Sequence, residues 1–146
     1  MAELTLFENI FSGAIPSHMV ARGENWYAFL DIQPRRAGHT LVIPKAGVQY
    51  YRDLSDDDRA GLNQGIVEVQ NILSKHFETN DFSVVLHDGA NAGQEIPHVH
   101  FHVIPRTQGD GGKSLLAMWP QAPAMGGEID HESLAQLSVQ LRENGD

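Results

Sequence analysis

The chain has 146 residues, 41% of them hydrophobic, and a formal charge of −9 with histidines neutral. This length suits one domain with a single core, and the acidic balance disfavours a general nucleic-acid-binding surface, because phosphate backbones are held mainly by Lys and Arg. The absence of cysteine excludes disulfides, and the absence of an apolar run of about 18 residues means that no membrane span is predicted.

The first predicted element is a short N-terminal helix. Leu4, Phe7 and Phe11 recur at helical spacing, and Gly13 and Pro16 end the pattern. The same stretch lacks the basic region and cleavage site of a signal peptide, so we expect a cytoplasmic protein.

Five segments have the composition of β-strands. They carry β-branched or aromatic residues and are bounded by turn-prone residues. The predicted strands are Met19–Arg22, Trp26–Ile32, His39–Pro44, Phe82–Leu86 and His98–Ile104.

A long helix is predicted to begin near Ser55, between the third and fourth strands. Ser55 is a suitable N-cap, and the three aspartates at 56–58 complement the helix dipole. An apolar stripe follows at a period of 3.6 residues, so one helix face should pack on a sheet. The stripe consists of Leu62, Ile66, Val69 and Leu73.

The remaining segments are predicted to be loops and a short closing helix. Gly89–Gly93 reads as a flexible loop and Gln108–Gly127 as a longer one, before Leu134, Leu137 and Leu141 at helical spacing.

The predicted fold class is therefore α+β, a mostly antiparallel five-stranded sheet with one long helix packed on it. We expect a single domain over residues 1–146, with a core at about 4–106 and a C-terminal loop and short helix over 107–146.

Three histidines alternate along the last predicted strand. In an extended strand His98, His100 and His102 share one face, each about 6.6 Å from the next. The intervening apolar residues should face the core; they are Val99, Phe101 and Val103.

Four interpretations of these histidines compete. They could be chance residues on a half-exposed strand, or metal ligands, although no cysteine or clear carboxylate pattern accompanies them. They could form a pH-sensing or binding surface without catalysis. They could also act at phosphorus, because a neutral imidazole attacks a phosphoryl centre and its adduct is labile to water.

The stretch from Gly93 to Ile104 resembles the signature of the histidine-triad (HIT) family, and further blocks match in order and spacing. The resemblance covers roughly residues 5–106. The other matching blocks are Ile15–Pro16, Ala28–Ile32 with Pro34, and Gly38–Lys45. The resemblance implies a HIT-like fold.

The resemblance also implies catalytic roles. The middle triad histidine, His100, would be the nucleophile that takes the nucleotidyl group. His102 would contact the phosphate and the scissile bond, and the backbone carbonyl of His98 would hold the nucleophile's ring in the right tautomer. His39 occupies the place of a fourth histidine beside the nucleophile.

Further residues are implied to bind a purine nucleotide. Asp31 would grip the ribose hydroxyls, Gln94 would hydrogen-bond the phosphate or leaving group, and Gly89 and Gly93 would let the loop approach the phosphate. The residues expected to line the purine slot, or else to be plain core, are Phe7, Ile10, Phe29 and Ile32.

The sequence departs from the family at three places. Many members have a Cys-x-x-Cys pair and a second histidine that bind a structural zinc with the first triad histidine; here the regions Leu4–Glu8 and Lys45–Gly47 lack all three, so we expect no metal. Glu95 replaces a frequent Ser or Thr and could act as an acid, repel anionic leaving groups, or merely be solvated. His87 replaces a frequent Asn and could donate a proton or point to solvent.

The resemblance thus implies a cofactor-free hydrolase of nucleoside phosphoramidates or dinucleoside polyphosphates that works through a covalent nucleotidyl-histidine. The expected partners are a small purine nucleotide and a second copy of the chain in a homodimer, with no membrane and no general nucleic-acid binding. The alternatives are a non-catalytic nucleotide- or partner-binding module and a metal-dependent hydrolase with histidine ligands.

Overall fold

A computed structural model describes residues 3–123 and 126–145 of the chain. The chain divides into two compact units, Met1–Asp110 and Gly111–Asp146. Each is described by itself, and the prediction of one domain over 1–146 stays a prediction.

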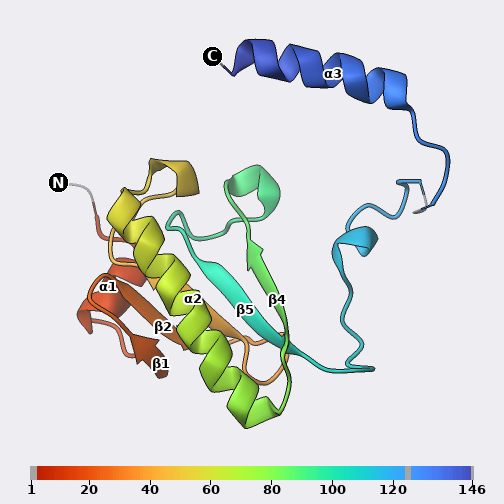
Figure 1. The fold of residues 1–146 in the computed structure, drawn as a ribbon. Helices are drawn as coiled ribbons and strands as arrows, with labels where there is room; N and C mark the ends of the chain where they lie inside the picture. The colour runs from red at the N-terminus through yellow and green to blue at the C-terminus, as the bar shows by residue number, and fades with distance from the viewer. Residues whose placement is uncertain (1–2, 124–125, 146) are drawn as a thin grey trace. The chain divides into compact units, whose positions relative to one another are not determined.

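The first unit is built on a five-stranded antiparallel sheet with the order β1-β2-β3-β5-β4 (Figure 1). The predicted α+β fold with one long helix on the sheet is confirmed. The strands are β1 (Met19–Arg22), β2 (Trp26–Leu30), β3 (Thr40–Pro44), β4 (Asp81–Leu86) and β5 (Phe101–Arg106).

The long helix α2 (Asp56–Phe77) lies across one face of the sheet (Figure 1). It begins as predicted, with the Ser55 side chain accepting a hydrogen bond from the backbone N–H of Asp58. The predicted stripe faces the sheet: Leu62, Val69 and Leu73 are buried. Burial of this stripe, rather than helix propensity, holds the helix in place.

Alternation along the strands gives the sheet two packed faces. In β2, Trp26 and Ala28 belong to a cluster under α2, which we call the α2 cluster, whereas Tyr27 and Phe29 belong to a second cluster on the opposite face. The second one, the α1 cluster, contains Phe7, Ile10, Tyr27, Phe29, Leu41 and Ile43.

The helix α1 (Leu6–Ser12) supplies Phe7 and Ile10 to this second face. Its N-terminus is a capping box, in which the Thr5 side chain accepts from the Glu8 N–H and the Glu8 carboxylate accepts from the Thr5 N–H. Gly13 ends the helix, as predicted, and adopts the left-handed conformation with φ of 86°.

The structure corrects two local predictions. Strand β5 begins at Phe101, so only His102 of the triad lies in a strand, and the backbone N–H groups of His98 and Val99 donate to loop carbonyls instead. The segment Gly89–Gly93 is not a free loop, because Ala90–Ala92 forms a 3-10 helix.

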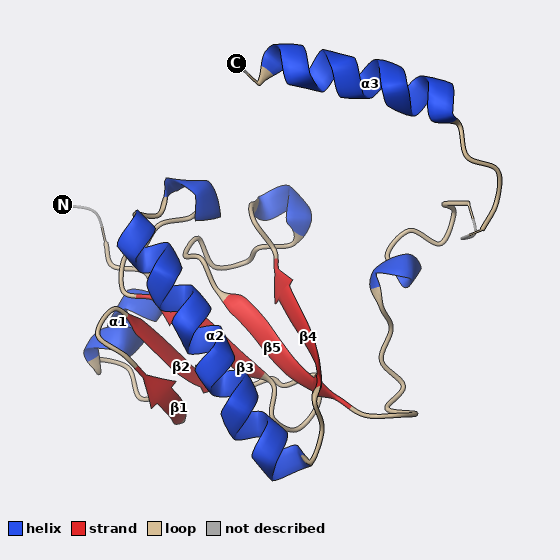
Figure 2. Cartoon of the chain, viewed as in Figure 1, coloured by secondary structure: helices blue, strands red, loops and turns tan. Residues whose placement is uncertain are grey.

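The second unit contains a 3-10 turn at Leu115–Ala117 and the helix α3 (His131–Asn144), coloured blue in Figure 2. The predicted C-terminal helix is thus confirmed, and the Asp130 side chain caps it by accepting from the N–H of Ser133. Within the described residues, no helix combines the length and apolar character needed to cross a bilayer.

Replacing Gly65 of α2 by Ala should destabilise the protein by about 1–3 kcal/mol. A Cβ at this position would meet Trp26 atoms at 2.7 and 2.8 Å, and the buried indole cannot move aside. Urea denaturation measures the change in the free energy of unfolding. The matched control is Asn71→Ala on the exposed face of α2, which should change it by less than about 0.5 kcal/mol. Equal effects of the two substitutions would contradict the packing argument.

Candidate functional site

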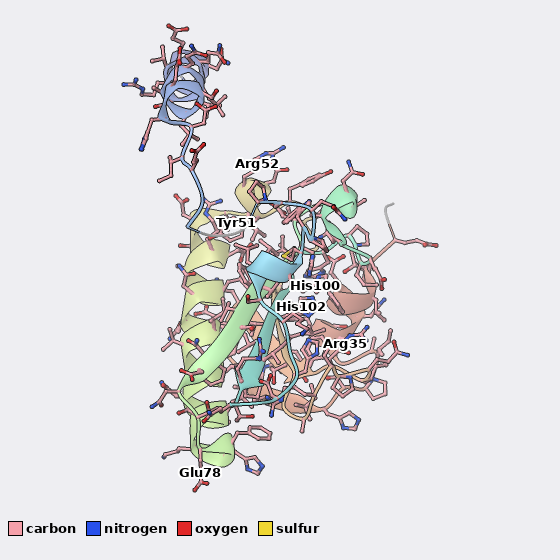
Figure 3. The ribbon with its side chains drawn as sticks, turned by 90° about the vertical axis from the view of Figure 1, so that its right-hand side faces the viewer. Arg35, Tyr51, Arg52, Glu78, His100 and His102 are labelled. Carbon is pink, nitrogen blue, oxygen red and sulfur yellow. The ribbon has the colours of Figure 1, made fainter. Side chains whose placement is uncertain are left out.

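The candidate site lies on the face of the sheet opposite α2. Leu41 of the α1 cluster pairs with His102 across β3 and β5, and cross-strand partners share a face. Figure 3 shows His100 and His102 on the side of the sheet turned away from α2. Their rings lie 5.2 Å apart, centroid to centroid.

His100 has one ring nitrogen committed and one available. Its Nδ1 lies 2.8 Å from the backbone carbonyl oxygen of His98, which can only accept, so Nδ1 carries the proton. The Phe7 ring packs edge-on against the His100 ring, with centroids 5.0 Å apart. In the neutral ring, Nε2 is therefore left with its lone pair.

Two consecutive hydrogen bonds fix the tautomers of His39 and His102. The backbone N–H of Arg35 donates to Nδ1 of His39 over 3.1 Å, so the proton of a neutral His39 ring must be on Nε2. This Nε2–H donates to Nδ1 of His102 over 2.9 Å. A neutral His102 therefore carries its proton on Nε2 and offers a donor, in contrast to the lone pair of His100.

Burial keeps these rings neutral. It lowers the pKa of His39, His98 and His100 below the ordinary value of 6.5. The largest effect is at His102, where burial, with smaller contributions from neighbouring histidines, lowers the pKa to about 4. At neutral pH the site thus holds unprotonated imidazoles, the state that a nucleophile requires.

His98 is an anchor rather than an exposed group. It is 0% exposed; its Nε2 lies 2.9 Å from the Pro44 carbonyl oxygen and its Nδ1 lies 2.7 Å from the Thr5 hydroxyl. The N–H of Val99 donates to the carbonyl of Val48, which fixes the backbone next to it.

The predicted ribose ligand, Asp31, lies beside His39. One carboxylate oxygen is 3.6 Å from Nε2 of His39, and the other accepts from the backbone N–H of Gln33. The carboxylate side chain is 21% exposed and so remains within reach of a ligand.

Gln94 supports the loop that contains the predicted phosphate-binding glycines. Its carbonyl accepts from the N–H of Gly89, and its amide donates to the carbonyl of Gln49, which leaves one amide hydrogen for a ligand. Gly89 and Gly93 have φ of 103° and 102°, a conformation that favours glycine. A Cβ on Gly93 would also approach the ring of His87.

His87 and Glu95 border the histidine cluster. The His87 ring centroid lies 5.7 Å from that of His102, and its Nδ1–H donates to the carbonyl of Ala92, which leaves Nε2 of the neutral ring as an acceptor. Glu95 is exposed, and its charge acts on His100, where it partly opposes the lowering of the pKa by burial.

Three of the four residues predicted to line the purine slot or the core are in the α1 cluster. Phe7, Ile10 and Phe29 are at most 9% exposed, whereas Ile32 is 82% exposed and open to a ligand. Phe7 connects the α1 cluster with the triad, because its ring packs against Phe29 and also against the rings of His98 and His100.

Two residues that the sequence analysis missed hold the histidines. Thr5 bonds to His98 through its side chain, and Arg35 bonds to His39 through its backbone. The Thr-x-x-Glu pattern of residues 5–8 indicates a helix cap, but it does not indicate that Thr5 also bonds to His98, 93 positions away. A backbone donor such as that of Arg35 leaves no signal in a sequence.

The hydrogen bonds oppose a metal ion among the histidines. Asp31, His39 and His102 place potential ligand atoms within 4.8 Å of one another. To ligate through Nε2, a neutral His39 would have to carry its proton on Nδ1, where it would face the donating N–H of Arg35.

The residues at the place of the family's structural zinc do not fit that ion either. Within Leu4–Glu8, the region that corresponds to the family's cysteine pair, the side chains of Thr5 and Glu8 are engaged with each other's backbone. Nδ1 of His98 is taken by the Thr5 hydroxyl, and a side chain at Gly47 would collide with the Glu8 carboxylate. Zinc sites of this type need four soft or nitrogen ligands, and His98 is the only such group among these residues.

Comparison with known proteins gives consistent matches. The model of the HIT domain family matches residues 12–109. An uncharacterized HIT-like protein of Methanocaldococcus jannaschii is 40% identical over 108 residues, 74% of this chain and 83% of that protein. The adenosine 5′-monophosphoramidase of Saccharomyces cerevisiae is 32% identical over 136 residues, 93% of this chain and 79% of that protein.

Two further matches extend this comparison. A bis(5′-nucleosyl)-tetraphosphatase of Schizosaccharomyces pombe is 37% identical over 83 residues, 57% of this chain and 46% of that protein. A crystal structure of a protein from Streptococcus mutans superposes with a TM-score of 0.84 and 29% identity, covering 100% of this chain and 88% of that one.

Acid should destabilise the fold through His102. The unfolded chain binds a proton at this residue near pH 6.5 and the folded chain only near pH 4, so the unfolded state binds more protons between these values. The free energy of unfolding should therefore fall as the pH is lowered from 6.5 to 4. Urea denaturation at several pH values tests this, with His102→Gln as the control that should show a smaller pH dependence. An unchanged dependence in that variant would contradict the assignment.

Proposed function

The chain belongs to the HIT domain family, and on this premise we propose that it is a nucleotide hydrolase in which His100 attacks the phosphorus of a purine nucleoside phosphoramidate. The observation that carries the proposal is the opposite polarity of two neighbouring rings. Nε2 of His100 offers a lone pair, and Nε2–H of His102 offers a donor, with ring centroids 5.2 Å apart. A nucleophile next to a donor suits attack on phosphorus with stabilisation of the developing charge.

The reaction would proceed in two steps. Nε2 of His100 forms a bond to phosphorus as the bond from phosphorus to the leaving amine breaks, and the amine takes up a proton from solvent. Water then attacks the phosphorus, the bond to His100 breaks, and the proton of that water returns to solvent. The His98 carbonyl holds the Nδ1 proton of His100 throughout and stabilises the positive charge that the ring acquires.

Nucleotide binding would use the open parts of the same face. The partly exposed Asp31 carboxylate can accept the ribose hydroxyl protons, and the loop at Gly89–Gly93 can bring backbone N–H groups to the phosphate. Exposed Ile32 offers apolar surface for a purine ring.

Two groups near the nucleophile favour an amine over an anionic leaving group. The Glu95 carboxylate acts on His100 and would repel a departing phosphate. In its neutral form, His87 presents an acceptor at Nε2, which can bind an amine N–H but not a phosphate oxygen. The similarity to the yeast phosphoramidase, which extends over 93% of the chain, supports the same choice over dinucleoside polyphosphates.

A non-catalytic nucleotide-binding module is the competing function. Binding alone does not require the lone pair of His100 next to the N–H donor of His102. The neutral histidine rings also provide no positive charge to bind an anionic nucleotide. The catalytic proposal explains both features.

His100→Asn should abolish turnover of adenosine 5′-phosphoramidate, with a loss of roughly 10³-fold or more in kcat, because the amide cannot form the bond to phosphorus. Binding of AMP, measured by calorimetry, should change little. The control is His76→Asn in the last turn of α2, which should retain full activity. Normal turnover by the His100 variant would refute the covalent mechanism.

Glu95→Gln should raise kcat/KM for diadenosine tetraphosphate relative to adenosine 5′-phosphoramidate by a few-fold. Removing the charge reduces repulsion of an anionic leaving group and leaves the amine reaction largely unaffected. Glu78→Gln is the matched control, because Glu78 lies at the far end of α2 from His100 and His102 (Figure 3). An equal ratio in both variants would show that Glu95 does not select the leaving group.

A further inference from the structure

We propose that Thr5, the N-cap of α1, is a positioning residue for the nucleophile: its hydroxyl donates to His98 and thereby fixes the peptide carbonyl that orients His100. The inference rests on the proposed function for its effect on catalysis. Its structural part, the state of the His98 and His100 rings, can be tested without any substrate.

The direction of each hydrogen bond at His98 follows from its partners. The Pro44 carbonyl can only accept, so Nε2 of His98 carries a proton. The neutral ring has no second proton, so Nδ1 is an acceptor and the Thr5 hydroxyl must be the donor over the 2.7 Å between them.

Thr5 can donate because its capping role uses a different part of the hydroxyl. The oxygen lone pair accepts the N–H of Glu8, which caps α1, while the hydroxyl proton goes to His98. One side chain therefore joins the start of a helix to the triad. Among good N-cap residues, only Ser offers the same hydroxyl donor.

The bond reaches the nucleophile through the His98 residue. With its ring held by Thr5 and Pro44, the backbone of His98 cannot rotate freely, and its carbonyl stays 2.8 Å from Nδ1 of His100. Phe7, two residues after Thr5, packs against both histidine rings, so the same helix also limits the tilt of His100.

Loss of the Thr5 hydroxyl would leave a buried acceptor without a donor. His98 is 0% exposed, and every buried side-chain nitrogen or oxygen in the described part of the chain has a hydrogen-bond partner. An unsatisfied Nδ1 favours a turned ring or the other tautomer, and either change moves the carbonyl that His100 needs.

The experiment compares Thr5→Val, which has the same shape without the hydroxyl, with Thr5→Ser, which keeps the donor. Ser55→Ala is the matched control, because it removes the N-cap of α2, which has no bond to the triad. Each protein is examined by NMR of ¹⁵N-labelled histidines without substrate, and by kcat and KM on adenosine 5′-phosphoramidate.

In the wild type, His98 should show a protonated Nε2 and a bare, hydrogen-bonded Nδ1. Thr5→Val should disturb the ring signals of His98 and His100 and lower kcat by roughly 10- to 100-fold with little change in KM, as expected for a misplaced reacting group. Thr5→Ser should match the wild type. Ser55→Ala should lose stability but keep kcat and the ring signals.

Three results would overturn the proposal: a wild-type His98 protonated on Nδ1, unchanged His98 and His100 signals in Thr5→Val, or an equal loss of kcat in Ser55→Ala. The wild-type spectrum decides even if Thr5→Val does not fold. A wild type without hydrolase activity would refute the proposed function alone, since the spectra would still report on Thr5.

Discussion

The site depends on the hydrogen bond that Nδ1 of His100 donates to the backbone carbonyl of His98, two residues earlier in the chain. It sets the tautomer of the ring and aims the free nitrogen. A single bond between residues so close in sequence would not hold a ring by itself, because the short segment before β5 lies outside the ladder of the sheet. The fold supplies what the ladder does not: a helix cap at Thr5, a strand end at Pro44 and a loop at Val48 each bond to this segment.

The two faces of the sheet divide the work of stability and chemistry. Under α2, the alternate positions of the strands are filled with apolar side chains that pack closely around Trp26. On the other face, the short α1 covers only part of the sheet, so polar groups such as His102 of β5 and Asp31, which follows β2, can lie together there. These imidazoles are buried enough to remain neutral but are reached by charges from Asp31 and Glu95. A fully closed face would have no room for a nucleotide, and a fully open one would let the rings protonate.

Periodicity and caps sufficed to predict most of the fold. The stripe on α2 and its cap at Ser55 are local properties, and they were read correctly. The alternation of the triad predicted three histidines on one face of a strand. It identified residues of one site, but His98 lies before the strand, and its ring bonds to Thr5 and Pro44. The family pattern located the histidines, because it concerns residue types at fixed spacing. It could not identify their partners, since Thr5 is remote in sequence and Arg35 acts through an N–H that every non-proline residue possesses.

The close approach of Gly47 to the Glu8 carboxylate determines what introducing zinc ligands here would cost. A histidine introduced at Gly47 would displace the Glu8 carboxylate, which would lose its hydrogen bond with the Thr5 N–H. A cysteine introduced at Thr5 would remove the hydroxyl that donates to His98. Each of these single substitutions would therefore break a hydrogen bond of the α1 cap or of His98 while the other zinc ligands are still missing. The same residues can thus hold His98 by hydrogen bonds or bind a zinc ion, but not both, and an exchange between the two arrangements requires several substitutions made together.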